Sequence, residues 1–367
     1  MNKQQEKELA QRLVKEIGRL AQLQEHPLRL MEVCGTHTVS IFRAGIRQLL
    51  PENIELVSGP GCPVCVTPDS YIDKAIAYAE RDDVILTTFG DMLKVPGSAS
   101  SLTEAQSNGA DIRILYSPMD SLQIAHEHPD KKIVFLAVGF ETTAPTAAAT
   151  VLAAKQQGIR NLFMLSAHKL VPPALHMLLN DPKVHVDGFL LPGHVAVVTG
   201  TDVFRFLARN YHIPGIVTGF EPLEILRSLV RLLQQKAEHR AEIGNEYGNV
   251  VRQEGNPVSR RILEQVYEPV DAEWRGIGTI PLSGLRMKEA FADYDIEWVL
   301  PLTIHVLPKK TACRCGEVLR GIVTPQACPL FGKACVPTHA IGPCMVSVEG
   351  VCAAWHKYGG GRFTYGK

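Results

Sequence analysis

Cysteines at three places along the sequence have the types and spacing of groups that bind metals or transfer electrons. The chain has 9 cysteines, an odd number. Ordinary thiols stay reduced in the cytosol, where we expect this protein, so a structural disulfide framework explains them poorly. We therefore interpret the cysteines as metal ligands, redox thiols or residues of the core.

The first place is the motif Cys34-Gly35-Thr36-His37-Thr38, at the end of a predicted strand and before a helical stretch over 39–50. The positive end of a helix lowers the pKa of a thiol and favours the thiolate, which binds soft metals. Cys34 is therefore a candidate metal ligand, and His37 is a candidate second ligand or proton carrier. The alternative is a buried cysteine beside a threonine that caps the helix.

The second place is the motif Gly59-Pro60-Gly61-Cys62-Pro63-Val64-Cys65, again between a predicted strand and a predicted helix. A Cys-x-x-Cys pair in an α/β setting indicates a redox dithiol or half of a metal site. Glycines and prolines pre-form the loop, which reduces the entropy lost in holding the sulfurs of Cys62 and Cys65 close together. A purely structural role is the weaker alternative.

The third place is the C-terminal tail, which holds the remaining cysteines: Cys313, Cys315, Cys328, Cys335, Cys344 and Cys352. The paired Cys-x-x-Cys knuckles of a zinc ribbon are absent, as are the closely spaced cysteines of bacterial ferredoxins. The irregular spacing and the adjacent prolines suit a loop-wrapped [4Fe–4S] cluster, which needs four thiolates and leaves two cysteines over. Zinc and a metal-free tail remain the alternatives.

Polar residues that directly follow predicted strands are further candidates for the site. Glu141 lies in Gly139-Phe140-Glu141-Thr142-Thr143, and His168 and His194 each come just after a strand. Ligands of open α/β sheets bind beyond the carboxyl ends of the strands. Phosphate-binding glycine motifs and a Gly-x-Ser-x-Gly nucleophile elbow are absent, so the sequence does not support nucleotide binding or serine hydrolysis.

Short apolar runs alternate with helical stretches from residue 28 onward, and this alternation must position those residues. The predicted strands are 28–33, 54–58, 84–88, 112–116, 133–138, 162–166, 188–191 and 215–218. The predicted helices between them are 68–81, 145–157, 172–179, 202–211 and 221–236. Such alternation predicts an α/β fold with parallel sheets covered on both faces.

The order of these elements predicts four segments. An amphipathic helix occupies residues 1–26, a first α/β domain with the Cys34 and Cys62/Cys65 motifs occupies 27–120, and a second, similar α/β domain occupies 121–250. Strand-to-helix junctions with Gly-Phe or Phe-Gly and an acidic residue recur, at 88–91, 139–143 and 219–222, which suggests that the two units are related. Residues 251–367 form the expected loop-rich C-terminal [4Fe–4S] domain.

Composition limits the classes of partner. The 367 residues carry 38 Lys+Arg and 38 Asp+Glu, so no net field attracts nucleic acid or an anionic membrane. No apolar run reaches the ~18 residues of a membrane helix. The first residues are polar and charged and do not resemble a secretory signal, so we expect a cytoplasmic protein.

Taken together, the motifs resemble those of the HypD family of [NiFe]-hydrogenase maturation proteins. The resemblance rests on the two cysteine motifs above, on Gly139-Phe140-Glu141-Thr142-Thr143-Ala144-Pro145, on Pro192-Gly193-His194-Val195 and on the cysteine-rich tail. It covers nearly the whole chain, in order. It implies a redox-active assembly scaffold, rather than a conventional turnover enzyme, on which the Fe(CN)2CO unit of the hydrogenase active site is built.

The resemblance also implies partners and residue roles. The small chaperone HypC would share the iron, and HypE would deliver cyanide as a C-terminal thiocyanate. Cys34 would be the iron ligand with His37 beside it, and Cys62 and Cys65 would be a nearby redox pair. The family's cluster domain is similar to ferredoxin:thioredoxin reductase. This analogy assigns Cys313, Cys328, Cys335 and Cys352 to the [4Fe–4S] cluster and pairs Cys315 with Cys344 as a dithiol, although Cys344 and Cys352 could exchange roles.

Two other functions remain open on the residues alone. A general thiol–disulfide oxidoreductase could use Cys62 and Cys65, supplied with electrons by the tail cluster, but it leaves Cys34 and His37 without a role. A zinc-stabilised adaptor without catalysis is the other alternative. In the scaffold hypothesis, Glu141, His168 or His194 could move protons, because all three follow strands.

Overall fold

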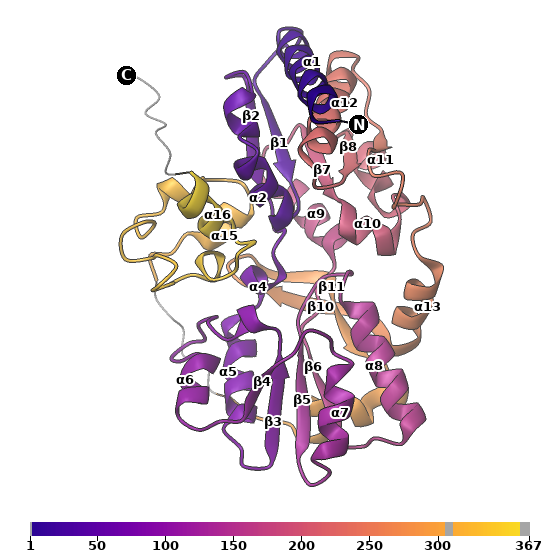
Figure 1. The fold of residues 1–367 in the computed structure, drawn as a ribbon, viewed down its shortest axis with the longest axis vertical. Coiled ribbons are helices and arrows are strands. Elements are labelled where there is room, and N and C mark those ends of the chain that lie inside the picture. Colours follow the sequence, from indigo (N-terminus) through magenta and orange to yellow (C-terminus); the bar gives the residue numbers. More distant parts are fainter. Residues whose placement is uncertain (1, 305–310, 360–367) are drawn as a thin grey trace.

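The computed structural model describes residues 2–304 and 311–359. Two parallel α/β units are stacked along the long axis of the molecule, an antiparallel hairpin lies between them, and a cysteine-rich segment packs at one side (Figure 1). The predicted fold class, two parallel-sheet α/β units followed by a loop-rich cysteine region, is confirmed. Residues 305–310 and 360–367 of the expected C-terminal domain lie outside the described residues.

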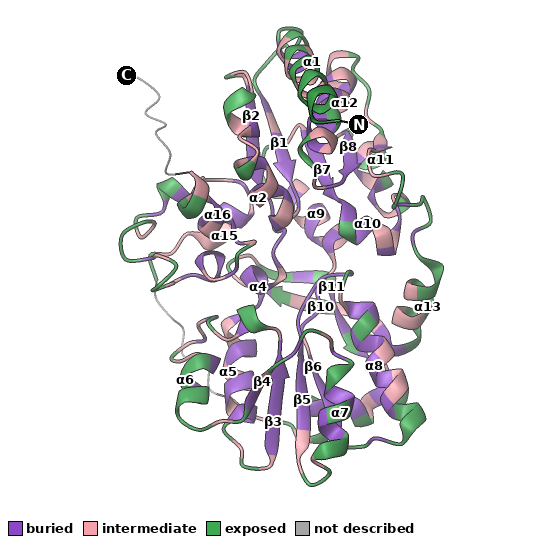
Figure 2. Cartoon of the chain, viewed as in Figure 1, coloured by how far each residue is buried: buried purple, intermediate pink, exposed green. Residues whose placement is uncertain are grey.

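The first unit contains a 5-stranded parallel sheet in the order β2-β1-β7-β8-β9. Its strands are short and largely apolar, and most of their residues are buried (Figure 2). The strands are β1 (Leu28–Glu32), β2 (Ile54–Ser58), β7 (Gly188–Pro192), β8 (Gly215–Thr218) and β9 (Ile243–Asn245).

The second unit contains a 4-stranded parallel sheet in the order β4-β3-β5-β6. Buried strands of this kind read as continuous apolar runs because helices cover both faces. The strands are β3 (Val84–Thr88), β4 (Ile112–Ile114), β5 (Lys132–Ala137) and β6 (Leu162–Ser166). The predicted strands therefore exist, with ends that shift by at most a few residues.

The two sheets do not follow the expected division of the chain at residues 120 and 121. Along the chain, β1 and β2 of the first sheet come first, all strands of the second sheet follow, and β7, β8 and β9 of the first sheet come last. The reason is that β1 pairs with both β2 and β7, whose positions are far apart in sequence. Strand order depends on such long-range pairing, which local patterns do not encode.

Helices cover the first sheet and begin at clear local signals. The N-terminal helix has a capping box in which Asn2 and Gln5 bond reciprocally, and α12 has one formed by Glu221 and Glu224. The helices of this unit are α1 (Lys3–Ala21), α2 (Gly35–Arg43), α3 (Ile46–Leu49), α10 (Gly193–Thr199), α11 (Arg205–Tyr211) and α12 (Pro222–Ala237).

The helices of the second unit are α4 (Pro63–Val66), α5 (Asp69–Ala79), α6 (Leu102–Ser107), α7 (Asp120–Glu127) and α8 (Ala144–Gln157). Two of them have a proline in the first turn, where its missing N–H group costs nothing: Pro63 in α4 and Pro145 in α8. From β6 the chain continues through α9 (Val171–Leu179) into β7 of the first sheet. After β9, α13 (Pro257–Val266) packs on α8.

An antiparallel hairpin of β10 (Tyr267–Trp274) and β11 (Gly278–Met287) was not expected from the sequence. The buried Trp274 ring stacks on Phe140, and its indole Nε1 donates a hydrogen bond to Ser283 Oγ (2.8 Å). Arg275 N donates to the Val66 carbonyl (2.8 Å), so the hairpin turn supports the Cys62–Cys65 loop. Residues 257–300 thus belong to the α/β body, and the expected start of the C-terminal domain at residue 251 was too early.

The cysteine-rich segment contains α15 (Cys315–Leu319) and α16 (Val351–Tyr358), joined by loops and short 3-10 turns. It packs on the first unit through Trp355, whose ring lies edge-on to Phe42 of α2 (5.1 Å). Its turn at Pro343–Met345 lies beside α4. Within the parts of the chain that the structure describes, no helix is both long and apolar enough to cross a bilayer.

Candidate functional site

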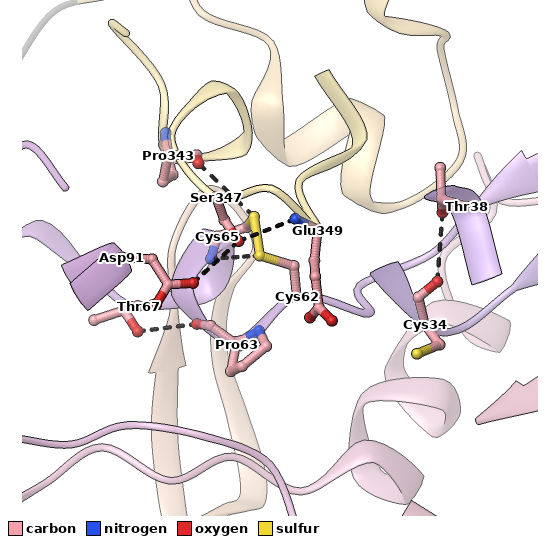
Figure 3. The surroundings of a disulfide bond; sticks show 10 residues. All are labelled: Cys34, Thr38, Cys62, Pro63, Cys65, Thr67, Asp91, Pro343, Ser347 and Glu349. Atoms are coloured by element: carbon pink, nitrogen blue, oxygen red, sulfur yellow. Dashed lines mark hydrogen bonds between the residues drawn. A yellow bond between two sulfur atoms is a disulfide. The ribbon is translucent and has the colours of Figure 1, made fainter. Parts of the chain in front are cut away.

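Three segments that are far apart in sequence meet at Cys34 (Figure 3). Cys34 follows β1 and is the N-cap of α2. Gly35 N donates to the Gly61 carbonyl (3.0 Å), and a Cβ at Gly61 would lie 2.4 Å from Cys34 Cα, so only glycine permits this approach. On another side, Thr36 Oγ1 donates to Glu349 Oε1 (2.7 Å). The thiol therefore lies where the Cys62 loop and the cysteine-rich segment both reach α2.

The expected low pKa of the Cys34 thiol is contradicted. Burial and, to a smaller extent, the nearby Glu349 carboxylate raise its pKa to about 11, against smaller opposite effects of hydrogen bonds from His37 and Thr36. Desolvation and a like charge outweigh the helix N-terminus here. The resting thiol is therefore protonated, and a metal must displace its proton in order to bind.

The His37 imidazole is buried and held in one tautomer. Nε2 lies 3.0 Å from the Gly219 carbonyl oxygen and 3.3 Å from that of Thr218, so Nε2 carries the proton and donates it. Burial lowers the pKa of His37 to about 4, which keeps the ring neutral. Nδ1 is buried and has no hydrogen-bond partner among the described residues. His37 thus keeps a lone pair for a proton or a metal, as its candidate roles require.

His194 belongs to the same group. Its ring and that of His37 both pack on Phe220, with ring centroids 4.0 Å and 4.7 Å from it. Partial burial lowers the pKa of His194, while the Glu349 carboxylate opposes this shift. His37, His194 and Phe220 follow β1, β7 and β8 respectively, and these strands are neighbours in the first sheet. The sequence-predicted Cys34, His37 and His194 are therefore brought together.

Glu349 and Phe220 are site residues that the sequence reasoning did not single out. Phe220 lies in one of the recurrent Gly-Phe-Glu junctions, so a signal for it existed. Glu349 lies in a loop of the cysteine-rich segment and carries no motif of its own. Only the packing of that segment on α2 places its carboxylate beside Cys34.

Cys62 and Cys65 form a disulfide, with Cα atoms 5.3 Å apart. Cys62 is the N-cap of α4, and Cys65 N donates to its sulfur (3.2 Å). Both residues are buried, and Cys65 Sγ lies 3.8 Å from the carbonyl oxygen of Pro343, the neighbour of Cys344. Figure 3 shows the pair with Cys34 and with Pro343 of the tail turn that carries Cys344. The proposed redox role of the pair stays a prediction.

Four of the tail thiols contact one another directly, and the other two lie in the same segment. Cys313 Sγ lies 3.1 Å from Cys315 Sγ. Hydrogen bonds with the Cys315 and Cys352 thiols raise the pKa of Cys344, and hydrogen bonds with the Cys315 and Cys344 thiols lower that of Cys352. The charges of Cys313 and Cys315 also act on Cys335. Cys328 is buried in the same segment.

These residues have the chemistry that an iron–sulfur cluster requires. Thiols that are close and largely buried can hold a [4Fe–4S] cluster through four of their number. In residues 2–304 and 311–359, no group of three or more His, Cys, Asp or Glu side chains has metal-site geometry. The donor set fits the cluster in kind, and the assignment of individual ligands stays a prediction.

Contrary to the expectation from the sequence, Glu141 and His168 do not belong to the group around Cys34. They follow β5 and β6 of the second sheet, whereas Cys34 and His194 follow strands of the first. Glu141 Oε1 accepts a hydrogen bond from Val171 N (2.9 Å), and its other oxygen is buried without a partner among the described residues. The shared position after strands was misleading because the strands belong to two different sheets.

We expect Glu141→Gln to flatten the pH dependence of stability. Burial raises the pKa of Glu141 from 4.5 to about 7, so between these values the folded protein holds a proton that the unfolded chain has lost. The wild type should therefore lose up to about 3 kcal/mol of unfolding free energy, relative to the variant, as the pH rises through this window. Urea unfolding at several pH values measures this difference. Parallel pH profiles for the two proteins would contradict the prediction.

Comparison with known proteins identifies the family. The family model HypD, described as the Hydrogenase formation hypA family, matches residues 8–359. The chain is 44% identical to the hydrogenase maturation factor HypD of Escherichia coli (strain K12) over 352 residues, which cover 96% of this chain and 94% of the relative.

Other relatives agree with this match. The hydrogenase maturation factor HypD of Rhodobacter capsulatus is 43% identical over 363 residues, which cover 96% of each chain. That of Azotobacter vinelandii is 44% identical over 338 residues, which cover 90% of this chain and 89% of the relative. The family match and these near full-length identities confirm the resemblance seen in the motifs, and the chain belongs to the HypD family.

Proposed function

We propose that the chain is a hydrogenase maturation factor on which the Fe(CN)2CO unit of the [NiFe]-hydrogenase active site is assembled, with Cys34 as the iron ligand. The observation that carries the proposal is the meeting at Cys34 of α2, the Cys62–Cys65 loop and Glu349. The names of the relatives support the coarser role in hydrogenase maturation.

Binding of ferrous iron, the substrate of the assembly, requires Cys34 to lose its proton. The raised pKa of the thiol means that the free site stays protonated and the metal drives the exchange. The Glu349 carboxylate, which Thr36 holds beside the thiol, is the neighbouring group placed to take this proton. A soft thiolate then suits low-spin iron that carries cyanide and CO.

The Cys62–Cys65 pair can supply the two electrons that release cyanide from a thiocyanate. The reduced dithiol and R–S–CN would give the disulfide, R–SH and HCN, so the dithiol is oxidised and both of its protons are accounted for. The disulfide in the structure corresponds to the oxidised product. Its position beside the Cys34 segment supports the assignment.

We assign a resident [4Fe–4S] cluster to Cys313, Cys328, Cys335 and Cys352, and a second dithiol to Cys315 and Cys344. The Cys315 and Cys344 thiols interact, as a dithiol requires, and both also interact with the Cys352 thiol. When bound, the cluster supplies one-electron redox chemistry. We propose HypC as the small chaperone that shares the iron and HypE as the donor of cyanide, and we propose no nucleic-acid or membrane partner.

Mössbauer and infrared spectra of anaerobically purified, iron-57-labelled protein, co-expressed with the small chaperone, test the proposal. We expect a [4Fe–4S] signal, a separate low-spin ferrous site, and vibrational bands of bound cyanide and CO. A cluster signal alone, together with turnover of generic disulfides, would instead support a thiol–disulfide oxidoreductase. Zinc in place of iron would contradict both functions.

A further inference from the structure

The turn of the β10–β11 hairpin, residues 275–277, touches two segments that both carry cysteines. On one side, Arg275 N donates a hydrogen bond to the carbonyl oxygen of Val66, which directly follows the disulfide (2.8 Å). On the other side, a Cβ at Gly276 would lie 2.9 Å from the Cα of Gly316 in α15, so the two backbones are in contact. One turn therefore lies between the disulfide loop and the first cysteines of the cysteine-rich segment.

The neighbours of this turn hold it in place. The preceding Trp274 is fully buried, and its indole Nε1 donates a hydrogen bond to Ser283 Oγ of β11 (2.8 Å). Gly276 has a φ of +71°, which favours glycine, and a Cβ on Gly316 would lie 1.9 Å from the Gly276 carbonyl oxygen. The side chain of Arg275 therefore extends from a fixed position between the two sulfur sites.

The guanidinium of Arg275 is largely buried, and only one of its two terminal nitrogens has partners. The side chain is 14% exposed. Nη2 donates a hydrogen bond to the Pro96 carbonyl oxygen (2.8 Å) and pairs with the carboxylate of Asp69, the first residue of α5. Nη1 is buried and has no hydrogen-bond partner among the described residues. A buried donor on a charged group is costly without an acceptor, so Nη1 requires an explanation.

The charge of Arg275 reaches the first thiol of the cysteine-rich segment. The Cys315 thiol and burial raise the pKa of Cys313, and the positive charge of Arg275 acts in the opposite direction. Arg314 adjoins both cysteines in the sequence, but it pairs with Glu317, and both of these side chains are about one-third exposed. Water and its partner therefore screen the charge of Arg314, whereas the charge of Arg275 acts from a drier position.

We propose that Arg275 is a positioning residue for the iron–sulfur cluster, in which Nη1 donates an N–H···S hydrogen bond to the Cys313 thiolate and the guanidinium charge favours the reduced cluster. The inference rests on the proposed function, because it needs the cluster that we assign to this cysteine. Four thiolates make a bound cluster anionic, and hydrogen bonds to the sulfurs and the net charge around them set its reduction potential. The same guanidinium is anchored to α5, the helix that follows the disulfide loop. Arg275 thus connects the cluster to the disulfide loop.

Potentiometric titration of the cluster, followed by electron paramagnetic resonance in the anaerobically purified full-length protein, tests the inference. In Arg275→Met we expect the equilibrium constant for reduction of the cluster to fall about tenfold, a shift of about 59 mV to more negative potential for one electron. The reason is that the added electron no longer has the positive charge and the hydrogen bond beside it. Arg286→Met is the matched control, because Arg286 lies at the far end of the same hairpin and pairs with Glu268 at the surface. It should leave the potential unchanged.

Asp69→Asn separates this electrostatic role from a structural one. It removes the negative charge that faces the guanidinium, so it should shift the potential of the cluster to more positive values, opposite to Arg275→Met. If Arg275→Met does not retain the cluster, the sign of the shift in Asp69→Asn decides. A wild-type potential in Arg275→Met, or a negative shift or none in Asp69→Asn, would overturn the inference and leave the proposed function intact. A wild-type protein without a [4Fe–4S] signal would overturn both.

Discussion

Replacing Cys34 with alanine is expected to abolish hydrogenase maturation and to remove the low-spin ferrous site, while the fold and the tail iron remain. In the disulfide state that the structure holds, neither Cys62 nor Cys65 offers a thiolate to replace the lost one. His37 Nδ1, which has no hydrogen-bond partner among the described residues, is a single neutral donor and cannot hold the iron alone. Mössbauer spectra and the activity of a co-expressed hydrogenase measure the two effects.

Ser40→Ala is the matched control for this experiment, because Ser40 lies on the same helix as the Cys34 cap and the change also removes one small polar group. It should leave both the iron spectrum and hydrogenase activity unchanged. Retained maturation in Cys34→Ala would refute the iron-ligand role. Loss of the tail iron as well would show that the variant had damaged the fold, and Cys34→Ser would then be the substitution to compare.

Glu32→Ala is expected to lower the free energy of unfolding by about 3–5 kcal/mol, because it leaves a largely buried cation without its partner. Glu32 is fully buried, and its Oε1 lies 2.6 Å from Arg47 Nη2. The same oxygen accepts a hydrogen bond from Ser58 Oγ (2.8 Å). One carboxylate therefore ties the ends of β1 and β2 to α3.

Arg47 extends this connection to the cysteine-rich segment, since its guanidinium lies 5.4 Å from the centre of the Trp355 ring of α16. Urea unfolding of Glu32→Ala compared with Glu55→Ala tests the expectation. Glu55 pairs with Arg29 but is half-exposed, so its removal should cost at most about 1 kcal/mol. Equal losses in the two variants would show that the buried pair contributes no more than a surface pair.

The buried ion pair of Glu32 and the Cys34 site are neighbours in the structure. Glu32 lies two residues before Cys34, and Ser58 directly precedes the loop that carries the disulfide. The buried ion pair therefore positions the strand ends from which both sulfur sites project. In this way the stability of the first sheet and the geometry of the Cys34 site depend on the same contacts.

The sequence by itself determined the strands from β1 to β8 and the residues that carry chemistry. Apolar runs of strand length, prolines at helix starts and the cysteine motifs are local signals, so the predicted strands 54–58, 84–88, 162–166 and 215–218 agree with β2, β3, β6 and β8. The family also followed from short motifs, because their residue types and order are distinctive.

Only the tertiary structure decided which of these residues act together. Pairing of β1 with β7 brought His194 to Cys34, and the same topology placed Glu141 and His168 in the other sheet. Packing of the cysteine-rich segment brought Glu349 to the site. Burial then reversed the expected shift in the pKa of Cys34. Contacts between distant segments and the loss of water around a group are properties of the folded chain, and local sequence patterns do not contain them.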